Sequence, residues 1–238
     1  MLILAIDSAT PVAGVALLNE EKLIKEEFFN YKKTHSETLM VMVDRVLREC
    51  ECTIGQIDVF AVTTGPGSFT GLRIGLAAVK GLSMATGKPV VAVSTLDTLA
   101  HNLWGSDALV CPLLDARKQE VYCGFYDVTG TVPYALSENL ACTPAEFVAQ
   151  ARKVASQSRK DRIILLGDGY YPYVEFFQAE LGNSLQIPPS HLMLPRAAAL
   201  GSLGFKKACQ GEFEDIFTLR PVYIRLSEAE YRLARGEL

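Results

Sequence analysis

The chain has few histidine and cysteine residues that could bind a metal, and it has no excess of Lys and Arg with which to bind nucleic acid. It holds three histidines, none four residues from another, and six cysteines without a C-x-x-C pair. Neither a histidine-metal helix nor a zinc cluster is indicated, so we expect no bound metal. Lys and Arg number 23 against 27 Asp and Glu, a net charge of −4, which argues against a protein that grips nucleic acid alone.

Long apolar runs are missing as well. None reaches the length of a membrane span, and the first seven residues lack the basic start of a signal peptide. We therefore expect no membrane association, and we interpret the cysteines as reduced thiols of a cytoplasmic protein. What the sequence does have is 49% hydrophobic residues over 238 positions, enough for one large or two small domains.

The order of the expected elements repeats along the chain. Each half reads strand, aspartate, turn, two further strands, helix and strand, with Asp7 and Asp115 as the aspartates. This pattern predicts a duplicated α/β fold, with one half at 1–103 and the other, including a C-terminal tail, at 104–238. Capping boxes at Thr34 and Thr143 predict the starts of two helices. Further helices are expected at 70–86, 94–104, 171–181 and 195–210, and a strand at 132–140.

The most distinctive segment runs from Gly65 to Gly75, between a predicted buried strand and the helix 70–86. Gly71, Gly75 and Ala78 lie on or near one face of that helix, where small residues allow another backbone to approach closely. The occupant could be a second helix of this chain or of another chain. Two other interpretations compete: a phosphate loop, although Phe69-Thr70-Gly71 stands where Gly-Lys-Ser/Thr is needed, and a helix simply buried in its own core.

The aspartates could also serve chemistry. Asp7 with Ser8 and Thr10 could orient a magnesium-bound water, with Asp115 facing it from the second half. Each aspartate could equally cap its own turn. The segment Gly167-Asp168-Gly169 after a strand could wrap an adenosine or form a simple turn. No nucleophile–base pair is recognisable.

Four segments together resemble the bacterial TsaB (YeaZ) family over nearly the whole chain. They are Ile3-Leu-Ala-Ile-Asp-Ser-Ala-Thr, Thr34-His-Ser-Glu, Gly65-Pro-Gly-Ser-Phe-Thr-Gly-Leu-Arg-Ile-Gly and Leu114-Asp-Ala-Arg-Lys-Gln-Glu-Val-Tyr. The resemblance implies a duplicated actin-like (ASKHA) fold of two RNase-H-like lobes. It also implies a non-catalytic role in making threonylcarbamoyladenosine next to the tRNA anticodon, as a subunit that dimerises with the transferase TsaD, with the ATPase TsaE joining them. ATP, magnesium and tRNA would then be bound mainly by the partners.

The resemblance further implies that the first two helices of the N-terminal lobe form the interface with TsaD, or with a second copy when the chain is alone. The residues expected there are Thr34, His35, Glu37, Thr38, Met42, Phe69, Thr70, Gly71, Arg73, Ile74, Gly75 and Ala78. TsaD binds a metal through two histidines four residues apart, whereas here His35 is followed by Leu39. The alternatives are an autonomous actin-like ATP-dependent phosphotransferase or ATPase using Asp7 and Asp115, and a peptidase, against which the missing histidine pair argues.

Overall fold

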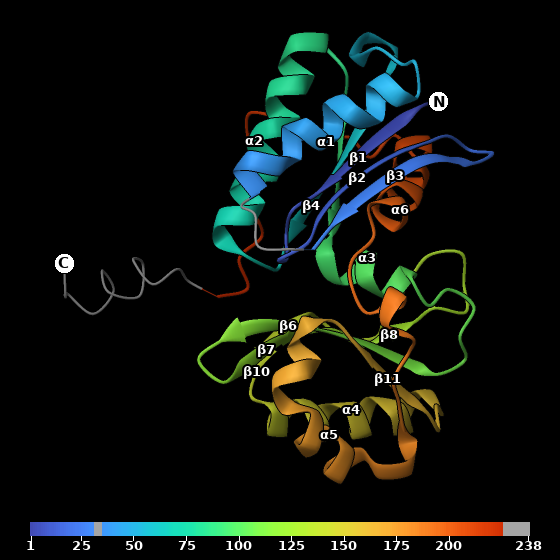
Figure 1. Cartoon of the computed structure of the whole chain (residues 1–238). Coiled ribbons are helices and arrows are strands. Elements are labelled where there is room, and N and C mark those ends of the chain that lie inside the picture. Colours follow the sequence, from blue (N-terminus) through green and yellow to red (C-terminus); the bar gives the residue numbers. More distant parts are fainter. Residues whose placement is uncertain (31–34, 226–238) are drawn as a thin grey trace, which may run out of the picture.

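The computed structural model describes residues 1–30 and 35–225, which form two α/β lobes stacked end to end (Figure 1). In the first lobe, the central strand β1 (Ile3–Asp7) runs antiparallel to β2 and parallel to β4. The sheet order is β3-β2-β1-β4-β5. The other four strands are β2 (Ala13–Leu18), β3 (Leu23–Phe29), β4 (Val59–Gly65) and β5 (Val90–Ser94). β1, β2 and β4 are buried along their whole length, as their continuous apolar runs predict.

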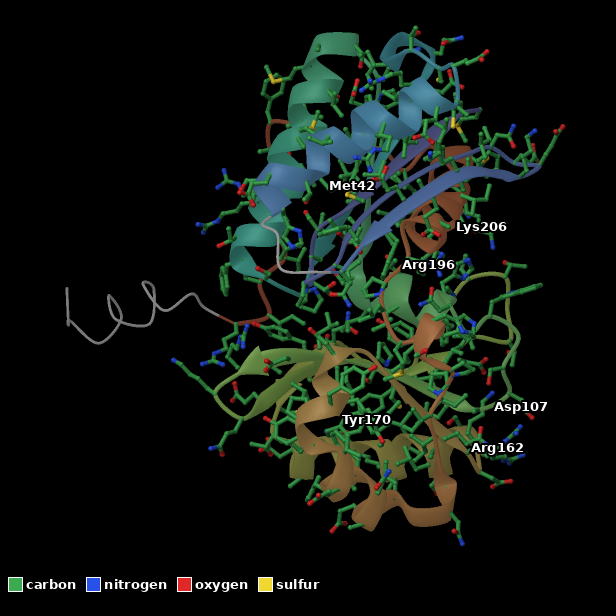
Figure 2. All side chains as sticks on the ribbon, viewed as in Figure 1. Met42, Asp107, Arg162, Tyr170, Arg196 and Lys206 are labelled. Carbon is green, nitrogen blue, oxygen red and sulfur yellow. The ribbon has the colours of Figure 1, made fainter. Side chains whose placement is uncertain are left out.

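Helices cover both faces of this first sheet. α1 (His35–Glu49) and α2 (Phe69–Thr86) lie side by side over one face, and α6 (Ala197–Cys209) lies over the other (Figure 1). The alternation of β1 divides its side chains between the two faces: Leu4 and Ile6 point to α1 and α2, while Ile3 and Ala5 point to α6. Met42 of α1, labelled in Figure 2, is buried in the core on the α1 and α2 side of the sheet.

The second lobe repeats the first. Its main sheet has the order β10-β7-β6-β11-β12, with the same pattern of two antiparallel pairs followed by two parallel pairs. Its strands are β6 (Leu109–Arg117), β7 (Glu120–Cys123), β10 (Leu140–Cys142), β11 (Ile163–Leu166) and β12 (Leu185–Gln186), with a side pair of β8 (Tyr126–Asp127) and β9 (Tyr134–Ala135). The predicted duplication is therefore confirmed.

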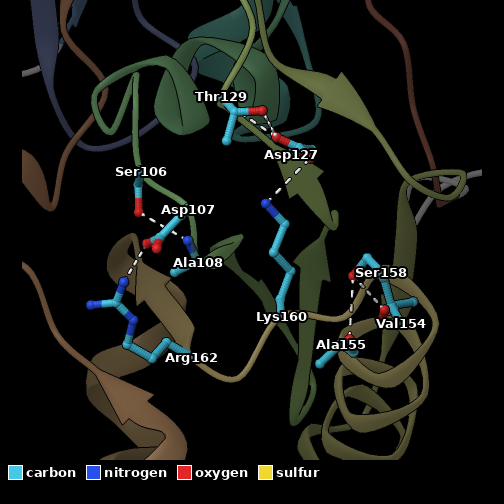
Figure 3. A network of polar contacts seen from close by, with 10 residues as sticks. All are labelled: Ser106, Asp107, Ala108, Asp127, Thr129, Val154, Ala155, Ser158, Lys160 and Arg162. Atoms are coloured by element: carbon cyan, nitrogen blue, oxygen red, sulfur yellow. Dashed lines mark hydrogen bonds and ion pairs between the residues drawn. The ribbon is translucent and has the colours of Figure 1, made fainter.

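The helices of the second lobe are α4 (Pro144–Ser158) and α5 (Val174–Leu181). Short 3-10 helices occur at Ile54–Gln56, Asp168–Tyr173, Gly182–Ser184 and Ser190–Leu192. Two sheets of like topology, each with its own helices, are the paired RNase-H-like lobes of the predicted actin-like fold. In this lobe Lys160 pairs with Asp127 of β8, and Arg162 pairs with Asp107 (Figure 3).

The last helix of each half packs on the other lobe. α3 (Thr95–His101) follows the first sheet but inserts Leu96 and Leu99 into the core of the second lobe. α6 follows the second sheet but packs on the first, where Gly204 lets it approach so closely that an added β-carbon would lie 2.8 Å from that of Ala61. The segment 197–209 therefore belongs to the second half of the sequence while its apolar face completes the core of the first lobe. The division at 103/104 itself stays a prediction.

Local signals agree with the structure in most places. Thr143 and Glu146 form the predicted capping box, and Gly87 ends α2 in the left-handed conformation with a φ of 69°. The strand expected at 132–140 is instead two short strands, β9 and β10. Thr34, with its predicted capping box, lies outside the described residues. Within the described part of the chain, no helix is both long and apolar enough to cross a membrane.

At the junction of the lobes, an ion pair between the half-exposed Arg196 and the buried Glu26 fixes the start of α6. Arg196, labelled in Figure 2, donates through Nε to Glu26 at 3.2 Å and pairs with it again through Nη2. The same carboxylate accepts the backbone N–H of Ala198 at 3.0 Å, which satisfies a donor in the first turn of α6.

Candidate functional site

The turn after β1 is held by hydrogen bonds within the turn and by one from Thr63 of β4. Asp7 Oδ1 accepts the N–H of Ala9 at 3.0 Å and the hydroxyl of Thr63 at 2.6 Å, and Thr10 Oγ1 accepts the N–H of Val12 at 3.3 Å. Asp7 therefore forms the Asx-type turn that was one of its two predicted roles. These two backbone donors point at side chains of the turn, whereas a phosphate site needs such donors aimed at the ligand.

Asp7 itself is almost fully buried. Its second carboxylate oxygen, Oδ2, is buried without a hydrogen-bond partner among the described residues. Burial raises the pKa of Asp7, and the bonds from Thr63 and Ala9 oppose the rise only partly. The side chain does not line the pocket between the lobes, described below.

The glycines of α2 pack against the same turn. A β-carbon at Gly71 would collide with the carbonyl oxygen of Ser8, and one at Gly75 would collide with the Ser8 hydroxyl. That hydroxyl donates to the Gly71 carbonyl at 2.9 Å. The close neighbour predicted for these glycines is therefore the β1–β2 turn of the same chain rather than a second helix. Gly71, Gly75 and the side chain of Met42 are buried within the chain.

A pocket of about 550 Å³ opens between the two lobes. It brings together several predicted residues from both halves, namely Thr10, His35, Phe69, Asp115 and Asp168. The lining also includes residues that were not predicted, among them Arg117, Lys118, Tyr122 and Arg225. The Asp115 carboxylate accepts the N–H of Arg117 at 2.8 Å, repeating the Asx-type turn of Asp7 in the second lobe.

The segment from Gly167 to Gly169 is shaped by packing on β6. A β-carbon at Gly167 would collide with the Leu113 carbonyl oxygen, and one at Gly169 would lie 2.8 Å from the carbonyl carbon of Leu114. Between them, Asp168 accepts the backbone N–H of Asp115 at 3.2 Å. Burial raises the pKa of Asp168. Neither glycine lines the pocket, so contacts within the chain account for both of them.

The two helices α1 and α2 contact each other, and we call their exposed outer surfaces together the α1–α2 face. It consists of the exposed or half-exposed residues Glu37, Met40 and Val41 of α1 and Thr70, Arg73, Ile74, Ala77, Ala78, Gly81 and Met84 of α2. The α2 members recur at the three- and four-residue spacing of one helix stripe. Met40 is 46%, Val41 52% and Met84 66% exposed, which is high for large apolar side chains.

Some of the predicted interface residues lie on this face and others do not. Glu37, Thr70, Arg73, Ile74 and Ala78 lie on it, whereas His35, Thr38 and Phe69 are half-buried near its edge. Met40, Val41, Ala77, Gly81 and Met84 also lie on this face but were not among the predicted residues, although their spacing relative to the buried stripe could have located them.

His35 is engaged at the start of α1. Its Nε2 lies 2.8 Å from the Thr10 carbonyl oxygen, and Leu39, one turn later, is buried in the core. Across residues 1–30 and 35–225, no group of three or more His, Cys, Asp or Glu side chains is arranged to hold a metal ion.

The comparisons with known proteins agree with this architecture. Residues 22–233 match the family model described as "TsaD: tRNA N6-adenosine threonylcarbamoyltransferase". The tRNA threonylcarbamoyladenosine biosynthesis protein TsaB of Bacillus subtilis is 35% identical over 231 residues, which cover 97% of this chain and 96% of that protein.

Among solved structures, YeaZ from Pseudomonas aeruginosa superimposes with a TM-score of 0.76 at 30% identity, covering 93% of this chain and 99% of that one. The activator of 2-hydroxyisocaproyl-CoA dehydratase from Clostridium difficile, an actin-like ATPase-fold protein, matches at a TM-score of 0.51 and 12% identity over 90% of this chain and 99% of that one. The latter shows the fold alone. With its paired lobes and its matches to TsaB and YeaZ along nearly its whole length, the chain belongs to the TsaB (YeaZ) family.

Proposed function

We propose that this protein is a non-catalytic, activating subunit in the biosynthesis of tRNA threonylcarbamoyladenosine, and that it binds the transferase TsaD through the α1–α2 face. The names of its relatives support the pathway. The observation that carries the docking role is the exposed apolar stripe on two adjacent helices, because exposed apolar area of this kind commonly marks a protein–protein interface.

The composition of the stripe suits a helical partner. Ala77, Ala78 and Gly81 are small, so a second helix can approach the α2 backbone closely. Met40 of α1 and Met84 of α2 are exposed on the same face, and their flexible thioether side chains adapt to an opposing surface. Arg73 adds a charged group near the start of α2, which gives the contact a polar rim.

The chemistry is assigned to the partners rather than to this chain. Supporting this, the N–H groups of Ala9 and Val12 are used inside the β1–β2 turn, and glycine-dependent contacts close Ser8 against α2. We therefore propose that ATP and magnesium are bound by TsaD and TsaE, that tRNA is reached only through the complex, and that the complex acts in the cytoplasm.

Light scattering on the chain alone and mixed with TsaD tests the docking role. The expected result is a heterodimer that is lost in Met84→Asp, because a carboxylate would be desolvated at the contact. Tyr134→Asp is the matched control, since Tyr134 is 69% exposed on β9 of the other lobe. Equal binding by both variants would refute the assignment of the α1–α2 face.

The same mixture tests the activating role. TsaD with its other partners should form threonylcarbamoyladenosine on tRNA much faster when this chain is present, and the Met84→Asp variant should remove the gain. An unchanged rate without the chain would contradict it. In the absence of TsaD we expect a homodimer through the same face, since a self-complementary apolar surface pairs by two-fold symmetry.

The competing function is an autonomous ATP-dependent phosphotransferase, favoured by the pocket between the lobes. Calorimetry with magnesium-ATP separates the two. We expect no binding heat from the chain alone. Binding that Asp115→Asn, a change in the pocket lining, weakens would support the phosphotransferase and overturn the assignment of nucleotide to the partners.

A further inference from the structure

The last described residues, Pro221 to Arg225, cross from one lobe to the other, and we call them the C-terminal clasp. On the first lobe, the Val222 N–H donates to the Thr64 carbonyl at 2.7 Å. Gly65 allows this approach, because its φ is 121° and an added β-carbon would lie 2.6 Å from the Val222 carbonyl oxygen. The clasp is therefore fixed beside the end of β4, directly before α2 begins.

Tyr223 of the clasp lies on the first turn of α2. Its ring stacks on Phe69 with centroids 4.4 Å apart and an angle of 23° between the planes. Arg73 Nε donates to the Tyr223 hydroxyl at 3.0 Å, and the guanidinium carbon lies 5.9 Å from the centre of the ring. Phe69 and Arg73 are one helical turn apart, so a single side chain fixes both of them.

The other end of the clasp is attached to the second lobe. Ile224 packs against the core of that lobe. Arg225 Nη1 donates to the Ala116 carbonyl at 3.3 Å and to the Glu120 carboxylate at 2.7 Å. Because it is attached on both sides, Tyr223 occupies one position relative to α2, which a free chain end would not provide.

We propose that Tyr223 is a positioning residue for partner binding: it holds Phe69 and Arg73 in the arrangement that TsaD recognises. The inference rests on the proposed function. Arg73 is exposed, and a long exposed side chain loses rotamer freedom when a partner orders it. Tyr223 orders the Arg73 side chain before the partner binds. It therefore raises the affinity for TsaD through Arg73 and not only through contacts of its own.

Affinity for TsaD, measured by calorimetry with the full chain, tests this role. We expect Tyr223→Ala to weaken binding about tenfold, from loss of the stack and of the Arg73 contacts together. Tyr223→Phe keeps the stack and loses the hydrogen bond, so a loss of about threefold is expected. Hydrogen exchange of residues 69–73 in the free chain should quicken in the same order. Phe217→Ala, at a residue 77% exposed in the same C-terminal region, should change neither.

The outcomes separate this inference from the proposed function. If Met84→Asp abolishes binding while Tyr223→Ala binds as the parent does, the clasp role is overturned and the docking face stands. If neither variant affects binding, the docking face fails as well. Should Tyr223→Ala not fold, Tyr223→Phe decides, because a partial loss of affinity at unchanged melting temperature supports the role and unchanged affinity refutes it.

Discussion

Alanine substitutions at Gly71, Gly75 and Gly81 test what the glycines of α2 do. All three lie inside the same 18-residue helix, so the intrinsic gain from replacing glycine by alanine is similar, about 1 kcal/mol for each. Their surroundings differ. Gly81 is exposed with nothing within 4 Å of an added β-carbon, whereas Gly75 faces the Ser8 side chain and Gly71 faces the Ser8 backbone.

The magnitudes follow from what must move. Gly81→Ala should stabilise the protein by about 0.5–1 kcal/mol. At Gly75 the Ser8 hydroxyl must rotate away and leave its bond to the Gly71 carbonyl, which costs about 1–3 kcal/mol in a buried site and outweighs the gain. At Gly71 the obstacle is a carbonyl oxygen that cannot rotate, so the helix or the turn must shift, and the loss should be larger still.

Chemical denaturation and thermal melting of the parent and the three alanine variants measure this order. For a chain of 238 residues, 1 kcal/mol corresponds to a shift of about 2–4 °C in melting temperature. The sharpest control is Ser8→Ala combined with Gly75→Ala, which should recover most of the loss, because only the hydroxyl obstructs position 75. The same Ser8→Ala change should not rescue Gly71→Ala. If Gly75→Ala is as stable as Gly81→Ala, the packing argument is refuted.

Three further predictions concern buried polar groups. Burial, aided by the charge of Lys206, lowers the pKa of His101 to about 4. The unfolded state therefore gains the proton first, and the parent should lose on the order of 1 kcal/mol of stability as the pH falls from 7 to 5. His101→Gln should flatten that pH dependence in denaturation curves. Burial raises the pKa of Asp7, so its charge disfavours folding above that pKa; the stability of Asp7→Asn relative to the parent should be greatest at pH 8 and fall towards pH 4, and a constant difference would contradict this. Tyr126 donates to Asp97 at 2.7 Å, so Tyr126→Phe should cost about 1–3 kcal/mol at pH 7, and a melting temperature equal to that of the parent would count against the bond.

Periodicity and turn chemistry were enough to predict the duplicated fold. The strands around Asp7 and Asp115, the capping box at Thr143 and the end of α2 at Gly87 are all local signals, and the structure contains each of them. The sequence also predicted that the small residues of α2 admit a close neighbour. It could not identify the neighbour, because a spacing of glycines carries no information about which distant segment fills it.

Long-range contacts account for what was missed. Tyr223 lies 150 residues from Arg73 in the chain, and no pattern near either residue indicates that they meet. The packing of α6 on the first sheet was not predicted for the same reason: the amphipathic pattern of 197–209 shows that one side must be covered but not which sheet covers it. The residues lining the pocket between the lobes come from both halves and were found only in part.

The exchange of α3 and α6 between the lobes has a consequence for how the protein is made. One face of the first sheet, with Ile3, Ala5 and Ala16, stays uncovered until residues 197–209 have left the ribosome. Synthesis from the N-terminus therefore yields no finished first lobe at its midpoint, but an intermediate with exposed apolar strands. A fragment ending at residue 103 should accordingly aggregate, and the two lobes should melt in one cooperative transition.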